Sequence, residues 1–382
     1  MDIRKLAHDV QDYVVAFRRD LHQNPEPSMQ EFRTTDQICK ALDELGVEYR
    51  RLDPVGVIAE VHGAKPGKIV ALRGDIDALS IQEKTSLSFK SQNDGFMHAC
   101  GHDTHASMLL GSVKVLNSIK DQFAGTVRFV FQPAEEIGEG AILAIKQGAM
   151  KDVSRMFGIH IGTQKTLGEI SYVMGASHAA AAQYSIKIKG KACHGAAPQA
   201  GADATVCAAA LVMNLQTIVS RETTPGEALV VTVGTLNSGS RWNIVSGEAE
   251  LTGTIRTYSR EMHEKMPGIL GRMIDSTCAA FRCEGELDYN TLTRVSFNDD
   301  ECMKQGVASA LKIQDKELVV LGKPTMGGED FAEYTFEAPS AFFSLGAGGE
   351  YPLHSDHMEL DESAFEVGVA LYVQCALDAL GA

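Results

Sequence analysis

The stretch GTVRFVFQPAEE, residues 125–136, has the pattern that decides the fold: a short apolar run that ends abruptly in charged residues. Its length and apolar content are those of a strand buried on both faces. Three other runs have the same form, VGVIAEVHG (55–63), KIVALRG (68–74) and RMFGIHIG (155–162). Helical periodicity lies between them, over residues 30–45 and 103–120. Strands that alternate with helices predict an α/β domain with a mainly parallel sheet.

The pattern changes near residue 180. AQYSIKIKG (182–190) alternates apolar and polar residues, as expected of a sheet with one solvated face. The elements that follow read helix, strand, strand, helix, strand, which completes the βαββαβ order of a ferredoxin-like domain. After residue 292 the α/β pattern resumes and ends in a helix over 363–380. We therefore predict a catalytic domain in two parts, 1–179 and 293–382, with an inserted domain over 180–292.

Composition excludes several classes of protein. The 382 residues are 44% hydrophobic and 22% charged, as in ordinary globular proteins. A net charge of −15 without any basic cluster argues against a nucleic-acid partner. We expect no membrane segment, because no apolar run approaches the ~18–20 residues of a span. The charged N-terminus lacks a secretory signal, and the eight scattered cysteines indicate reduced thiols, so we expect a cytoplasmic protein.

Metal-binding and proton-transferring side chains follow the buried strands. The strand at 68–74 leads to Asp75 and Asp77, the strand at 126–132 leads to the pair Glu135–Glu136, and the strand at 155–162 ends on His160. A final strand, AFFSLGAG, is followed within about ten residues by His354. Sites in open α/β sheets form beyond the carboxyl ends of the strands. These residues are therefore expected to converge on one crevice.

The segment HACGHDTH, residues 98–105, supplies further ligands. In an extended segment Cys100 and His102 would share a face and could bind one ion. Asp103 is suited to cap the following helix, whereas His98 and His105 are expected to lie behind the ligands. The sequence leaves open a second role for Cys100, as a nucleophile with a histidine base. Four other histidines lack such context and are expected at the surface: His8, His22, His62 and His263.

The adjacent Glu135 and Glu136 suit metal-assisted hydrolysis. One carboxylate can bind a cation while its neighbour takes a proton from water, which the cation makes more acidic. A protein that only binds metal has no need of the second carboxylate. A dinucleotide-dependent enzyme is not supported either, because no GxGxxG joins a strand to a helix.

Several stretches together resemble the M20 metallopeptidase family, most closely its N-acyl-amino-acid amidohydrolase, hippurate hydrolase and auxin-conjugate (IAA-amino acid) hydrolase branch. The matching stretches are RRDLHQNPEPSMQE, ALRGDIDALSI, MHACGHDTHAS, GTVRFVFQPAEE, FGIHI, GKACHGAAP, WNIVSGEAELTGTIRT, MGGEDFA and LHSDHMELDE. The resemblance covers nearly the whole chain. It implies a metal-dependent amidohydrolase with a lid or dimerisation domain inserted into the catalytic domain, and a homodimer formed through that insertion.

The resemblance also implies roles for individual residues. Two divalent cations would be held by five side chains: Cys100, His102, Glu136, His160 and His354. Glu135 would be the general acid/base, and Asp77 would support the metal centre. In the inserted domain, His194 would reach the substrate, often across the dimer interface in the family, and Asn243 and Arg256 would lie on the substrate side.

Departures from the family pattern affect residues beside these positions: Ser80, Ala192–Cys193, Ser246 and Asp356. None replaces an implied ligand, although His357 is an alternative to His354. The expected reaction is amide hydrolysis of N-acyl-L-amino acids, with acetyl or aromatic acyl groups. A dipeptidase or carboxypeptidase, an N-acetyl-diaminopimelate-type deacetylase, and a non-catalytic metal-binding protein are the alternatives. Thiolate with imidazoles suits zinc, and carboxylates with imidazoles suit manganese, cobalt or nickel.

Overall fold

In the computed structural model, which describes residues 1–382, the chain forms two compact units. The first unit comprises Met1–Ser177, Phe297–Lys323 and Asp330–Ala382, and the second comprises His178–Ser296 and Pro324–Glu329. The short segment Pro324–Glu329 differs from the expected arrangement, which placed it in the catalytic domain. It joins the second unit because the Ala179 N–H donates to the Thr325 carbonyl, at 3.1 Å.

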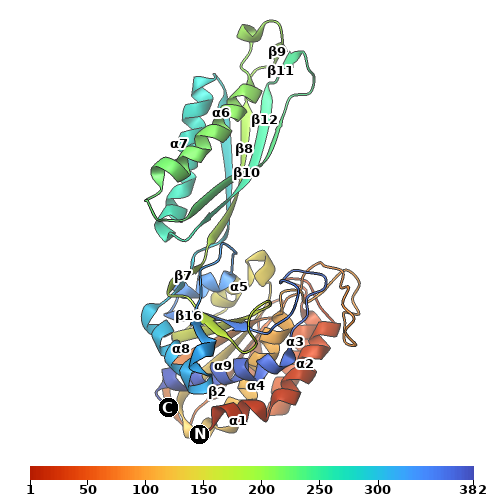
Figure 1. Cartoon of the computed structure of the whole chain (residues 1–382), viewed down its shortest axis with the longest axis vertical. Helices are drawn as coiled ribbons and strands as arrows, with labels where there is room; N and C mark the ends of the chain where they lie inside the picture. The colour runs from red at the N-terminus through yellow and green to blue at the C-terminus, as the bar shows by residue number, and fades with distance from the viewer. The chain divides into compact units, whose positions relative to one another are not determined.

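An eight-stranded sheet forms the centre of the first unit (Figure 1). Its strands lie in the order β1 (Glu48–Arg51), β2 (Val57–His62), β4 (Ala124–Gln132), β3 (Lys65–Asp75), β5 (Val153–Gly162), β16 (Ser340–Gly346), β6 (Ile170–Tyr172) and β15 (Val319–Leu321). The four central strands, β4, β3, β5 and β16, run parallel to one another. Both edges contain antiparallel pairs, which the sequence did not indicate. The predicted α/β fold with a mainly parallel sheet is confirmed.

Helices cover both faces of this sheet. On one face, α4 (His102–Ser118), α8 (Asp300–Ile313) and α9 (Phe365–Leu380) pack on the sheet, and α1 (Ile3–His8), α2 (Gln11–Gln23) and α3 (Phe32–Leu45) complete that layer. On the other face lie α5 (Gly140–Lys146) and the short helix η6 (Asp330–Phe336). Along β5, Phe157, Ile159 and Ile161 join the α4 core, whereas Met156 joins the α5 core. Because side chains alternate along a strand, His160 lies on the α5 face.

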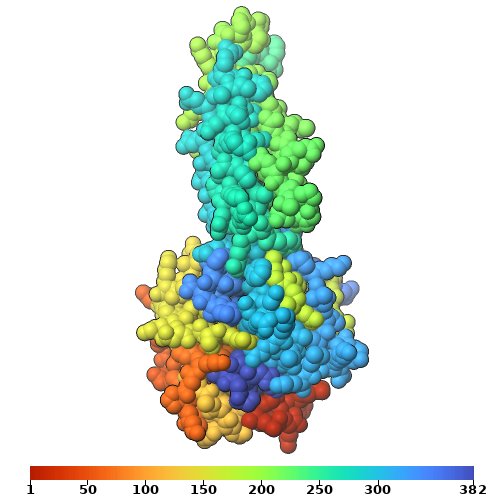
Figure 2. Space-filling view, turned by 90° about the vertical axis from the view of Figure 1, so that its left-hand side faces the viewer, coloured from red at the N-terminus to blue at the C-terminus, as the bar shows by residue number.

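The second unit has the predicted ferredoxin-like order. Its elements are β8 (Ala180–Lys189), α6 (Ala204–Thr217), β10 (Leu229–Ser238), β12 (Glu248–Thr257), α7 (Arg260–Ala280) and β13 (Glu284–Thr293). The strands form an antiparallel sheet in the order β10-β12-β8-β13. Helices α6 and α7 lie side by side and bury one face of it, as Figures 1 and 2 show. A small sheet of β9 (Cys193–His194) and β11 (Ile244–Val245) completes the unit.

Two helical stretches are long and apolar enough to span a membrane, Ala204–Glu222 and Glu362–Leu380, contrary to the expectation that no run reaches that length. The second stretch is 67% buried and contributes Val369, Tyr372 and Val373 to the main core. The first is 33% buried and contributes Leu211 and Leu215 to the core of the second unit. Core helices of globular domains meet the same criteria, so these two stretches are weak evidence for a membrane.

Candidate metal centre

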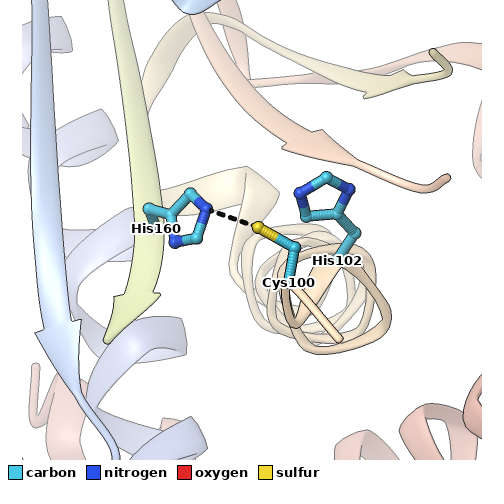
Figure 3. A group of neighbouring side chains, drawn as sticks. All are labelled: Cys100, His102 and His160. Atoms are coloured by element: carbon cyan, nitrogen blue, oxygen red, sulfur yellow. Dashed lines mark hydrogen bonds between the residues drawn. The ribbon is translucent and has the colours of Figure 1, made fainter. Parts of the chain in front are cut away.

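The first unit brings together all five side chains that the sequence implies as metal ligands. Cys100 and His102 lie at the start of α4, Glu136 lies in the short helix η2 (Glu135–Ile137) after β4, and His160 lies in β5. The donor atoms of Cys100, His102 and His160 lie within 4.8 Å of one another, and so do those of Cys100, Glu136 and His354. In Figure 3 the Cys100 thiol lies between the two imidazoles, 3.4 Å from His160 Nε2. The Cys100 thiol therefore belongs to both sets of three donor atoms.

The chemistry of these atoms fits divalent cations. His102 Nε2 and Glu136 Oε1 are buried without a hydrogen-bond partner, an arrangement that costs free energy unless something binds them. They lie 3.9 Å apart, and His354 Nε2 lies 3.7 Å from the same carboxylate oxygen. Ligands at ~2.1 Å from a tetrahedral ion are about 3.4 Å apart, so modest adjustment would complete a site. Thiolate, imidazole and carboxylate ligands are typical of zinc and other transition-metal centres.

Asp77 holds His102 in the orientation that a metal ligand needs. Its Oδ1 lies 3.0 Å from His102 Nδ1, which leaves Nε2 facing Glu136. Its Oδ2 accepts hydrogen bonds from the Ser28 hydroxyl at 2.7 Å and from the Glu136 N–H at 3.0 Å. Burial alone would raise the pKa of Asp77, but the bonds from His102 and Ser28 hold it below its ordinary value. Asp77 thus remains a carboxylate that joins two ligand-bearing segments.

His105 lies behind the candidate ligands. Its Nδ1 bonds the Asp75 carboxylate, and its Nε2 accepts the Ile161 N–H at 2.8 Å, so neither nitrogen is available to an ion. Its ring centroid lies 4.5 Å from that of His160. His160 Nδ1 bonds the Ile161 carbonyl at 2.6 Å, and burial lowers the pKa of this imidazole. His160 is therefore held neutral, with Nε2 directed at the thiol.

Glu135 lies on the same turn as Glu136. The preceding residue, Ala134, has φ +54, and its N–H is held by the buried Glu31 carboxylate at 2.8 Å. Burial, followed by repulsion from Asp77, raises the pKa of Glu31 to about 8. Glu135 Oε1 accepts the Asp330 N–H at 3.4 Å, and a carboxylate oxygen of Glu135 lies within 4.8 Å of the donor atoms of His102 and Glu136. Glu31 was not singled out from the sequence, because only the fold brings it beneath this turn.

His354 is better placed than His357. The His354 backbone has φ +65, uncommon for a residue other than glycine, and its N–H donates to the Ala99 carbonyl at 2.8 Å. This geometry directs its imidazole toward Glu136. His357 instead bonds Asp356 at 2.6 Å and lies beside the Tyr351 ring.

Three expectations about this region are wrong. Asp103 does not cap α4, because Gly101 adopts a left-handed conformation (φ +83) and the helix begins at His102. The Asp103 carboxylate instead pairs with Arg18 at 2.8 Å and His22 at 2.7 Å. His22, expected at the surface, is therefore fully buried. The segment before α4 is also a turn rather than extended, with the Gly101 N–H 3.4 Å from the His98 carbonyl.

A second buried arginine, which no local pattern in the sequence indicated, joins the segments behind the centre. Arg73 of β3 is 1% exposed and bonds Asp75 at 2.5 Å and Asp330 at 2.7 Å. Gln132, the last residue of β4, accepts from Arg73 Nε at 2.9 Å and donates to Asp330. Asp75 in turn holds His105. This Arg73 cluster, which comprises Arg73, Asp75, Gln132 and Asp330, thereby joins β3, β4, α4 and η6.

The three substrate-side candidates all lie in the second unit. His194 in β9 is opposite Ile244 of β11, and the Gly195 N–H donates to the Asn243 carbonyl at 2.8 Å, so His194 and Asn243 are neighbours. Strand β12 begins at Glu248, three residues after β11 ends. Arg256 lies eight residues farther along β12, which at ~3.3 Å per residue is roughly 26 Å from Glu248. Its guanidinium donates to the carbonyl of the preceding residue, Ile255, and to the hydroxyl of Thr254. Arg256 is thus separate from the other two.

Comparisons with known proteins show the family to which this chain belongs. The family model for peptidase family M20/M25/M40 matches residues 71–378. An N-acetylcysteine deacetylase of Bacillus subtilis is 34% identical, covering 95% of this chain and 96% of its own. Thermostable carboxypeptidase 1 of Saccharolobus solfataricus is also 34% identical, covering 98% of each. The crystal structure of Bacillus subtilis YXEP, described as a dinuclear metal binding peptidase from the M20 family, superposes with a TM-score of 0.87 at 33% identity, covering 98% of this chain and 99% of that one. The chain belongs to peptidase family M20/M25/M40 and is a metal-dependent amidohydrolase.

Proposed function

We propose that this enzyme hydrolyses the amide bond of N-acyl-L-amino acids and releases a carboxylic acid and a free amino acid. Two divalent cations would be held by Cys100, His102, Glu136, His160 and His354. The observation that carries this proposal is the pair of buried, unpartnered atoms His102 Nε2 and Glu136 Oε1, with a second carboxylate beside them on the same turn. Bound cations at this position would polarise the amide carbonyl and lower the pKa of water toward ~7.

Three side chains would provide the proton transfer, the orientation of a ligand and the hydrogen bond that the reaction also needs. Glu135 takes the proton from the attacking water and then gives it to the nitrogen of the leaving amine. Asp77 keeps His102 oriented while charge develops at the reacting carbonyl. His194 donates a hydrogen bond to the oxygen of the tetrahedral intermediate, a contact of a kind worth about 2.7–4 kcal/mol.

The relatives support this substrate class and also show the alternative. A deacetylase of N-acetylcysteine acts on an N-acyl amino acid, whereas a carboxypeptidase acts on a peptide. Both reactions cleave an amide bond, so the metal centre alone does not separate them. The choice of substrate separates the two reactions, because acetyl- and benzoyl-amino acids lack the free amino group of a dipeptide.

A substrate panel tests the proposal. Chelator-treated enzyme is expected to be inactive, and zinc, manganese, cobalt and nickel are then restored one at a time. We expect hydrolysis of acetyl-, benzoyl- or indoleacetyl-amino acids, measured as release of free amino acid. Turnover of unblocked dipeptides alone would favour a peptidase, and turnover of N-acetyl-diaminopimelate alone would favour the narrower deacetylase.

We further propose a cytoplasmic homodimer formed through the second unit. All eight cysteines are free, which suits a reducing compartment. Strand β10 is an edge strand of its sheet, and α6 exposes Val206 and Met213, with 69% of Met213 accessible. Unpaired edges and exposed apolar side chains are common where subunits meet.

Mixed variants test whether His194 acts across that interface. His194→Ala and Glu135→Gln homodimers should each bind metal and have little activity. Mixing and refolding them should restore about a quarter of the wild-type rate, because half the dimers are hybrids and each hybrid contains one complete site. Steady-state rates and light scattering measure this. If the mixture stays inactive while hybrids form, His194 does not serve the neighbouring subunit.

A further inference from the structure

A row of polar side chains runs sideways from His160 across three adjacent strands. In the register of the sheet, His160 of β5 is directly opposite Ser344 of β16, and Ser344 is directly opposite Ser171 of β6. Residues directly opposite one another project from the same face of a sheet. The two serines therefore lie on the face that bears the His160 imidazole. Strands are ~4.8 Å apart, so the row extends roughly 5–10 Å from His160.

The ammonium of Lys165 lies over this row. Its Nζ donates to the Ser344 hydroxyl at 2.9 Å and lies 3.4 Å from the Ser171 hydroxyl. Glu169 accepts a hydrogen bond from the Ser171 hydroxyl at 2.6 Å, and its charge also attracts the Lys165 ammonium without a direct contact. An ammonium has three donors, and Lys165 forms no ion pair. A half-buried ammonium whose direct hydrogen-bond partners are neutral hydroxyls is costly, and burial lowers the pKa of Lys165 by more than the charge of Glu169 raises it.

The strands leave space for this side chain. Gly162 and Gly346 are opposite one another, two residues beyond His160 and Ser344. A Cβ added to Gly162 would lie 2.9 Å from Lys165 Cδ and 3.2 Å from Ser344 Oγ, and one added to Gly346 would lie 3.1 Å from Lys165 Cβ. The lysine stem therefore runs over a pair of glycines. Larger residues at either position would displace it.

We infer that Lys165, with Ser344 and Ser171, forms a subsite for a second carboxylate of the substrate. The inference rests on the proposed function, since the reacting amide would lie at the metal centre beside His160. The amino acid's own carboxylate lies about one residue length, ~3.6 Å, from the amide carbonyl, whereas the row of serines extends roughly 5–10 Å from His160. A carboxylate on the amino-acid side chain or at the end of a dicarboxylic acyl group reaches farther. The preferred substrates are thus N-acyl-amino acids with two carboxylates.

Three substrates separate the sources of that carboxylate: N-acetyl-L-alanine, N-acetyl-L-glutamate and N-succinyl-L-alanine. For wild type we expect the lowest KM with one of the two diacids. Lys165→Met should raise the KM for that diacid tenfold or more, with kcat and metal content nearly unchanged, and the KM for N-acetyl-L-alanine should stay within about twofold. Lys165→Arg should retain much of the preference, and Lys68→Met, an exposed lysine of the same unit, should behave as wild type.

A binding measurement keeps this test separate from that of the proposed function. Titration calorimetry of metal-free protein with glutarate should show binding to wild type and at least tenfold weaker binding to Lys165→Met. If wild type hydrolyses none of the three substrates but binds glutarate through Lys165, the substrate class is wrong and the subsite stands. If Lys165→Met changes neither glutarate binding nor the KM of either diacid, or raises the KM of all three substrates equally, the subsite is refuted.

Discussion

Replacing Glu135 with glutamine should lower kcat by roughly 10²–10⁴-fold while both metal positions remain filled. Glutamine has nearly the same shape and still accepts the Asp330 N–H through its carbonyl oxygen, so the turn after β4 should keep its geometry. It cannot accept a proton from water at neutral pH. The loss should therefore appear in kcat rather than in KM.

Steady-state kinetics together with metal analysis measure this loss. Glu139→Gln is the matched control, because Glu139 lies on the same loop but is exposed. It should have wild-type kinetics. A Glu135→Gln enzyme that retains more than a tenth of the wild-type kcat, with metal bound, would show that the proton acceptor is another group.

Replacing Arg73 with methionine should lower the free energy of unfolding by about 3–5 kcal/mol, a large part of the 5–15 kcal/mol of a typical domain. The loss arises because two buried carboxylates, Asp75 and Asp330, would lose their shared cation. Methionine fills much of the space of the arginine stem, so the effect reports on charge more than on volume. Metal affinity should fall as well, since Asp75 holds His105 against β5.

Urea unfolding of the metal-free protein measures this change. Arg51→Met is the matched control: Arg51 pairs with Asp36 at 2.6 Å, but both side chains are more than half exposed, and such pairs contribute about 0–1 kcal/mol. Adding Asp330→Asn to Arg73→Met should recover part of the loss, because it removes one unpaired charge. If Arg73→Met costs no more than Arg51→Met, the Arg73 cluster does not stabilise the fold.

The sequence predicted the parts of this molecule that depend on local pattern. Buried strands, the helices between them and the switch to alternating strands near residue 180 all have short-range signatures. The polar residues after each strand were sufficient to indicate convergence, because parallel strands bring their carboxyl ends to one edge. The antiparallel pairs of β1 and β6 were missed because these strands are only four and three residues long, and the β2–β4 pair was missed because no local pattern gives the direction of a strand.

The contacts that the sequence did not reveal all join distant segments. His22 has the local appearance of a surface residue on an amphipathic helix, yet Asp103, 81 residues away, holds it in the core. Arg73 resembles an ordinary strand residue until Asp330, 257 residues away, is seen beside it. The partners of Lys165 depend on the registers of three strands, which no local pattern fixes.

We propose that one thiol, three imidazoles and a carboxylate bind a pair of cations beside Glu135. A crystal structure of the manganese-loaded enzyme, with anomalous maps recorded at the manganese edge, would locate these cations. We expect two anomalous peaks per chain, both within bonding distance of the Cys100 sulfur, with His102, His160, Glu136 and His354 completing the coordination and Glu135 unbound to either ion. Peaks located elsewhere, or a Cys100 sulfur and His102 Nε2 that contact no ion, would refute this metal site.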